Sequence, residues 1–139
     1  MKIQNILALI TVPGICLTLS SCSRNAAEVM AEACALIENA AEVLNKATPA
    51  NAEESADDLV DIADDMADLA NYIQENNDTF KQELDAMSDS EREIILAGLL
   101  KATITLQKST EKAIANGAMD NPKLKAAFER LNREFNAMN

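Results

Sequence analysis

The sequence predicts an all-α protein, an antiparallel up-and-down bundle of four main helices. Aromatic residues make up 3% of the 139 residues and hydrophobic residues 48%, a composition rich in alanine, leucine and other good helix formers. Only three Gly and three Pro occur, too few for the many turns of a β fold. Long segments space their apolar residues three or four apart, which is typical of core-facing helices.

The first helix is expected over residues 25–46. Its apolar residues form two neighbouring stripes, and most of its glutamates lie off them. One stripe is Val29, Ala33, Leu36, Ala40 and Val43, and the other is Met30, Cys34, Ile37, Ala41 and Leu44. Residues 47–55 contain Pro49 and are predicted to be a loop.

The second helix, over about 53–75, contains the heptads DDLVDIA and DDMADLA. Its apolar residues step by three and four, which predicts a buried seam. The members of this seam are Leu59, Ile62, Met66, Leu69 and Ile73. Beyond it the pattern leaves two alternatives open: a separate short helix near 79–87, started by Thr79 and Gln82, or a continuation of the second helix on nearly the same face.

Ser88 with Glu91, or Ser90 with Glu93, offers a capping box for another helix, which runs to about Asn116. The first half of this helix is apolar nearly all round, so we expect it to be the most buried element. Asn116-Gly117 ends it, and a last helix starts near Pro122 and continues to about Met138.

The first 22 residues, MKIQNILALITVPGICLTLSSC, have the pattern of a secretory signal peptide. A basic residue, Lys2, precedes an apolar stretch from 6 to 19. That stretch is shorter than the roughly 20 residues that span a bilayer as a helix. This leader is therefore predicted to be a signal peptide, followed by the helical bundle domain.

The end of this segment, Leu19-Ser20-Ser21-Cys22, resembles the lipobox of bacterial lipoproteins. The resemblance covers this segment alone. It implies that the sulfur of Cys22 receives a diacylglycerol, that a signal peptidase cuts before Cys22, and that the new amino terminus is acylated, for example with palmitate. The signal peptide would then be residues 1–21 and the helical bundle domain residues 22–139. Such chains anchor a protein to a membrane stably. The residue after Cys22 is Ser23 and not Asp. In that family, the absence of Asp at this position favours the outer membrane, facing the periplasm or the cell surface.

Two Asp-Asp-x-x-Asp clusters, at 57–61 and 64–68, resemble the magnesium-binding clusters of prenyl-chain synthases. In those enzymes the clusters face each other from separate helices across a cavity. Here both lie in one helix, seven residues apart, opposite its apolar seam, so we expect a solvated face and no metal site. The face is a candidate surface for a basic protein partner or weakly held Ca²⁺. Its residues are Asp57, Asp61, Asp64, Asp65 and Asp68.

Composition excludes several kinds of chemistry. The sequence contains no His, which removes Ser-His-Asp and Cys-His systems and His-ligated zinc or haem. It contains no glycine-rich phosphate loop, and no cofactor is expected. Residues 24–80 carry 14 acidic residues against two basic ones, whereas residues 81–139 carry nine of each. This acidity disfavours nucleic-acid binding. Cys34 lies on an apolar stripe and is predicted to be a buried, inert thiol.

Together these patterns predict a lipid-anchored lipoprotein of the bacterial cell envelope with a non-enzymatic binding or scaffolding role. Its partners would be the membrane, through the lipid on Cys22, and a basic protein. The alternative is a small-molecule or lipid carrier that holds its ligand between the helices. An open cavity lined by Met66, Leu100 and Phe128 would favour that alternative.

Overall fold

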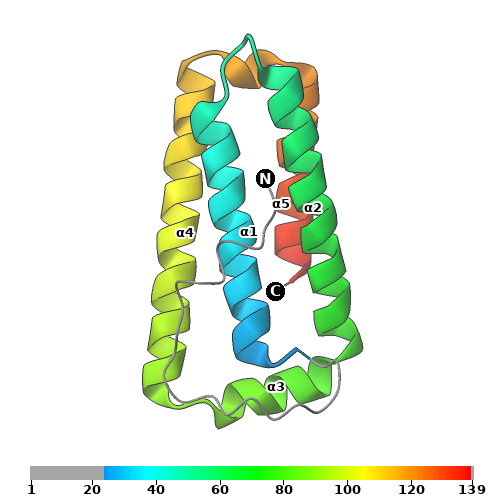
Figure 1. Cartoon of the computed structure of the whole chain (residues 1–139), viewed down its shortest axis with the longest axis vertical. Coiled ribbons are helices and arrows are strands. Elements are labelled where there is room, and N and C mark those ends of the chain that lie inside the picture. The colour runs from blue at the N-terminus through cyan, green and yellow to red at the C-terminus, as the bar shows by residue number, and fades with distance from the viewer. Residues whose placement is uncertain (1–23, 139) are drawn as a thin grey trace.

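The computed structural model describes residues 24–138, and Cys22 and the predicted signal peptide lie outside this range. The described part is all-α (Figure 1). Its elements are α1 (Ala26–Lys46), α2 (Ala52–Glu75), α3 (Asn77–Ala86), α4 (Asp89–Ala115), the short 3-10 helix η3 (Ala118–Asp120) and α5 (Pro122–Ala137). The four long helices alternate in direction along the chain, which confirms the predicted up-and-down bundle.

The structure decides between the two alternatives left open after the second helix. α2 ends at Glu75, and α3 is a separate helix that crosses the foot of the bundle, the end at which α1 begins (Figure 1). Asn76 separates α2 from α3 with φ −113° and ψ 22°, outside the helical range, so the α2 axis stops there. The short extra helix is confirmed, with a start two residues earlier than predicted.

Capping boxes start two of the long helices, α1 and α4. The Asn25 side chain accepts a hydrogen bond from the Glu28 backbone N–H, and the Glu28 carboxylate accepts one from the Asn25 N–H. Ser88 and Glu91 form the same reciprocal pair at the start of α4. Each box satisfies two backbone donors that the helix cannot pair internally. Of the two predicted boxes for α4, the one at Ser88 is therefore confirmed.

The long helices pack as two close pairs, α1 with α4 and α2 with α5, and α1 also contacts α2. Two contacts fix the register of α1 and α4. The Cys34 sulfur would lie 3.6 Å from a Cβ added to Gly98. Farther along, the Lys112 ammonium donates to the Asn45 backbone oxygen at 2.7 Å. Both helices therefore rise in the same direction from the foot, while α2 and α5 descend.

The core consists largely of alanine and leucine side chains. Its largest fully buried members are Val29, Ile37, Leu44, Leu59, Met66, Leu69, Leu124 and Leu131. Alanines such as Ala40, Ala63, Ala102 and Ala113 have no exposed surface. Small side chains at these contacts let the helix backbones approach each other closely, so the interior needs few large residues.

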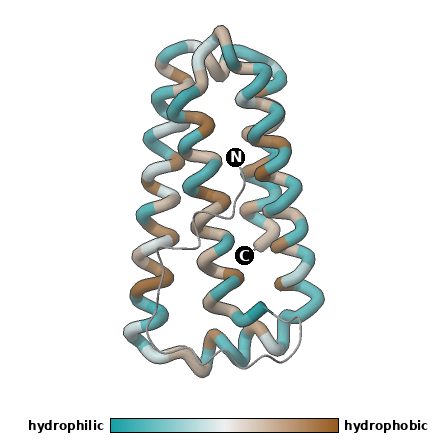
Figure 2. The backbone as a smooth tube through the Cα atoms, in the orientation of Figure 1, coloured by the Kyte–Doolittle hydropathy of each residue, from teal (hydrophilic) through white to brown (hydrophobic). Residues whose placement is uncertain are grey.

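The prediction that the first half of α4 is the most buried element is wrong. Ile94, Leu96 and Leu100 expose 63%, 64% and 63% of their surface, and the buried residues of α4 are Ala102, Ser109 and Ala113. Figure 2 shows hydrophobic positions recurring along the foot half of this helix. The reason is geometric. α4 packs mainly against α1 and little against α5, so one face is covered and the opposite apolar face is not.

Replacing glycine by alanine should change stability in opposite directions at Gly98, within α4, and at Gly117, just after it. Gly117 has φ +82°, a conformation that side chains disfavour, so Gly117→Ala should lower the free energy of unfolding by about 1 kcal/mol. Gly98 lies within α4, where an added Cβ meets Cys34 at an ordinary 3.6 Å. Gly98→Ala should therefore raise stability by about 0.5–1 kcal/mol. Urea unfolding of both variants measures the two shifts, and shifts of the same sign would contradict this account.

Candidate functional site

The face of α2 that carries the aspartates points to solvent. Leu59, Met66 and Leu69 of the predicted seam are at most 1% exposed, and Ile62 and Ile73 are partly buried against the same core. All five aspartates named from the sequence are exposed. Successive residues of an α-helix turn by about 100°, so Asp57, Asp61, Asp64 and Asp68, at spacings of four, three and four, form one line opposite the seam. We call these four residues and Asp65 the acidic face.

The C-terminal helix supplies basic side chains to one border of the acidic face. The Arg130 guanidinium of α5 forms an ion pair with Asp64. Lys123, also in α5, lies 3.4 Å from the Glu53 carboxylate at the start of α2. None of the salt bridges within residues 24–138 involves Asp57, Asp61, Asp65 or Asp68. Four of the five carboxylates therefore remain free to meet an external cation.

Neighbouring carboxylates of the acidic face crowd the side chain of Asp65. Its pKa is raised above the ordinary value, first by partial desolvation and then by the negative charges of Asp68, Asp61 and Asp64. Like charges three or four residues apart on a helix repel each other. The acidic face thus stores an electrostatic repulsion that a bound cationic group would relieve.

The contribution of Asp65 to the free energy of unfolding should consequently fall as pH rises through its raised pKa. The folded state holds the proton of the Asp65 carboxyl more tightly than the unfolded chain does. The destabilisation caused by the ionised carboxylate is therefore absent below the unfolded pKa near 3.8 and complete above the folded pKa. Asp65→Asn should raise the free energy of unfolding at pH 7 by about 0.5–1 kcal/mol, because it removes the repulsion from Asp61 and Asp68, which lie four and three residues away on the same helix. The gain should vanish near pH 3. Thermal unfolding across this range measures it, and an equal gain at both pH values would contradict the cause given.

The acidic face does not assemble a metal centre in this structure. Among residues 24–138, no three His, Cys, Asp or Glu side chains come close enough to hold a metal ion. The spacing explains this result, because carboxylates on the convex surface of one helix diverge from each other. A cation would therefore be held by the summed negative field and not by a fixed set of ligands.

The cysteine on α1 differs from its prediction. Cys34 is half-buried and not fully buried, and it is unpaired. Desolvation, followed by the charge of Glu38, raises the pKa of its thiol. Because the thiolate is the reactive form, the raised pKa lowers the fraction of this thiol that can react near neutral pH.

The surface of the described bundle has hollows that open to solvent, and two of them bear on ligand binding. One, of about 490 Å³, lies between α1 and α4 and mixes apolar surface with charged side chains, with Glu38, Glu42, Lys108 and Lys112 on its walls. The other, of about 240 Å³, lies at the foot and is mainly apolar. Its walls are formed by Met30, Leu84, Asp85, Met87, Arg92, Ile95 and Leu96. Neither hollow is lined by Met66, Leu100 and Phe128, the residues whose open cavity would have favoured the carrier alternative.

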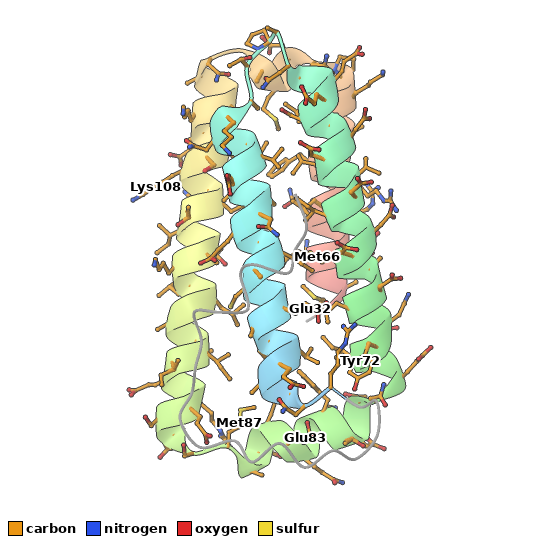
Figure 3. All side chains as sticks on the ribbon, viewed as in Figure 1. Glu32, Met66, Tyr72, Glu83, Met87 and Lys108 are labelled. Atoms are coloured by element: carbon orange, nitrogen blue, oxygen red, sulfur yellow. The ribbon has the colours of Figure 1, made fainter. Side chains whose placement is uncertain are left out.

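At the foot, several contacts fix the point at which the chain enters the bundle. The Tyr72 hydroxyl donates to the Arg24 backbone oxygen at 2.9 Å, and the Arg24 guanidinium lies 5.7 Å from the Tyr72 ring centre. The Glu83 carboxylate of α3 accepts the Ala26 backbone N–H at 2.6 Å. Figure 3 shows Tyr72, Glu83 and Met87 together at this end. Sequence analysis missed this cluster because its members are far apart in the chain and depend on how α3 crosses the foot.

No family model, curated protein or solved structure matches this chain. Among residues 24–138, no helix combines the length and the hydropathy needed to cross a bilayer.

Proposed function

We propose that the chain is a lipid-anchored lipoprotein of the bacterial cell envelope with a non-enzymatic binding or scaffolding role. The observation that carries this proposal is Leu19-Ser20-Ser21-Cys22 at the end of a basic-then-apolar leader. The position of α1 supports it. Its N-cap, Asn25, lies three residues after Cys22, so a lipid on Cys22 would hold the bundle by its foot, directly at the membrane. Ser23 favours the outer membrane.

Replacing the acylated residue tests the anchor. Wild-type protein produced in a bacterial host should fractionate with membranes and partition into the detergent phase of a phase-separating detergent. Cys22→Ala blocks acylation and the cleavage that depends on it. It should leave an unprocessed chain that still carries residues 1–21, heavier in its polypeptide than the wild type. Two chains with the same processed amino terminus would contradict the proposal.

The acidic face is the proposed docking surface for a basic protein partner. Its five exposed carboxylates lie on one helix, and one of them, Asp64, already pairs with an arginine of α5. Charge complementarity of this kind steers association and fixes its orientation. The interaction should accordingly weaken as salt rises, because exposed charges are screened beyond about 8 Å at physiological ionic strength.

Neutralising variants test this surface with a matched control. The test variant is Asp57→Asn, Asp61→Asn, Asp65→Asn and Asp68→Asn together. The control removes the same number of exposed charges elsewhere, in Glu38→Gln, Asp85→Asn, Glu111→Gln and Glu129→Gln. Capture of envelope proteins on the wild-type bundle identifies partners, and each partner should bind the test variant about tenfold or more weakly while binding the control nearly normally. Equal loss in both variants, or binding insensitive to salt, would remove the acidic face as the docking surface.

A further inference from the structure

An apolar surface on the foot half of α4 has no partner within the described bundle. Leu96 and Leu100 are each more than 60% exposed, and Ile104 adds a third exposed side chain one turn farther. Their spacing of four places all three along one side of α4. Leu96 also forms part of the apolar hollow at the foot, where Met30, Leu84, Met87 and Ile95 are its other apolar walls. We call Leu96, Leu100 and this hollow the foot face. Contiguous exposed apolar surface of this kind marks an interaction site.

The foot face lies at the same end of the bundle as the proposed anchor. Cys34 packs beside Gly98, so Leu96 is level with about residue 32 of α1. At a rise of 1.5 Å per residue, that level is about 9 Å above the start of α1 at Ala26. Four residues of chain can place Cys22 no more than about 14 Å from Ala26. The reach of the tether and the height of the foot face therefore overlap.

The direction of the tether is also constrained. Tyr72 holds the Arg24 backbone, and Glu83 holds the Ala26 N–H, so the chain enters the bundle at a fixed place beside α3. Figure 1 shows that α3 and the beginning of α4 share this end with the start of α1. A bilayer that contains the acyl chains of Cys22 would thus lie at the end of the bundle that carries both α3 and the foot face.

We propose that the foot face rests on the hydrocarbon of the membrane in which Cys22 is anchored, and this inference rests on the proposed lipidation. Acyl chains suit its chemistry, because methionine side chains adapt to irregular apolar partners and Leu and Ile gain by leaving water. A weak apolar contact is sufficient once a lipid anchor supplies the first attachment. Exposed acids border the face at Asp85, Asp89, Glu91 and Glu93, so the membrane surface it fits is zwitterionic and not strongly anionic.

A single tryptophan in an otherwise tryptophan-free chain reports on this contact. Leu100→Trp places the reporter on the foot face. Ile114→Trp is the matched control, because Ile114 is 60% exposed on the same helix but about 21 Å farther from the foot. Both proteins are purified in lipidated form, with acylation of Cys22 verified by mass, and reconstituted into phosphatidylcholine vesicles that contain acyl-brominated lipid. Both positions are exposed, so folding should be kept, which circular dichroism verifies.

The bromine atoms should quench the Leu100→Trp emission at least about twofold more than the Ile114→Trp emission, and reconstitution should shift only the former to the blue. Equal quenching of the two with Cys22 acylated would overturn the inference and leave the anchor intact. A blue-shifted Leu100→Trp emission that appears equally in detergent, together with a cross-linked dimer, would assign the foot face to contact with a second copy of the chain. That result would also overturn the inference. An unacylated Cys22 would remove the proposed function and, with it, this inference.

Discussion

Leu59→Ala should lower the free energy of unfolding by about 2–5 kcal/mol, the range found when a leucine in a packed core is truncated. Leu59 has no exposed surface and lies in the seam of α2. Its removal takes apolar contacts away from the interior and leaves a cavity, which the long, straight helices around it cannot easily collapse to fill. Urea unfolding followed by circular dichroism measures the loss.

Leu100→Ala is the control, because it makes the same chemical change on the exposed face of α4. Its effect should stay within about 0.5 kcal/mol. Comparable losses for Leu59→Ala and Leu100→Ala would show that the seam of α2 is not the interior, and the solvent-facing orientation of the aspartates would fail with it.

Ala102→Leu should destabilise the bundle by about 1–3 kcal/mol through overpacking. Ala102 has no exposed surface, and it lies on the face of α4 that packs against α1. A leucine there would have to push the α1 and α4 backbones apart. Thermal unfolding measures the effect.

Ala97→Leu is the matched control, since Ala97 lies in the same helix and is exposed. It should leave the melting temperature within a few degrees of wild type, because about 0.5 kcal/mol shifts a domain of this size by that amount. A core that accepted Ala102→Leu as readily would be loose, and the small-residue packing of α1 on α4 would be contradicted.

The helices and the seam of α2 could be predicted because their signals are local. Leu59, Met66 and Leu69 repeat with the period of the helix, and Ser88 with Glu91 marks the start of α4. The separation of α2 from α3 could not be decided, because no side chain caps α3 and the apolar stripe continues through it. That break depends on how α3 crosses the foot.

The burial of α4 was predicted wrongly because periodicity reports apolar faces and not what covers them. Leu99 and Ala102 face α1, whereas Leu96 and Leu100 look outward. A helix that is apolar all round is fully buried only when neighbours surround it, and α4 has one close long-helix neighbour. An all-round apolar pattern therefore also fits a helix with one covered face and one exposed apolar face.

The outward direction of the acidic face followed from the spacing of its aspartates, but its partners within the fold did not. Only the packing of α5 on α2 brings Arg130 to Asp64 and Lys123 to Glu53, residues about 70 positions apart. Likewise, Tyr72 and Glu83 meet the start of α1 through tertiary structure alone.

The mass of the amino-terminal peptide tests the central claim, a bundle held to the membrane through Cys22, most directly. The protein is purified from the envelope of the producing cells, digested with protease and analysed by mass spectrometry. The account predicts a first peptide that begins at Cys22 and carries the added mass of a diacylglycerol and an amide-linked acyl chain. A peptide that begins at Met1, or one that contains an unmodified Cys22, would contradict it.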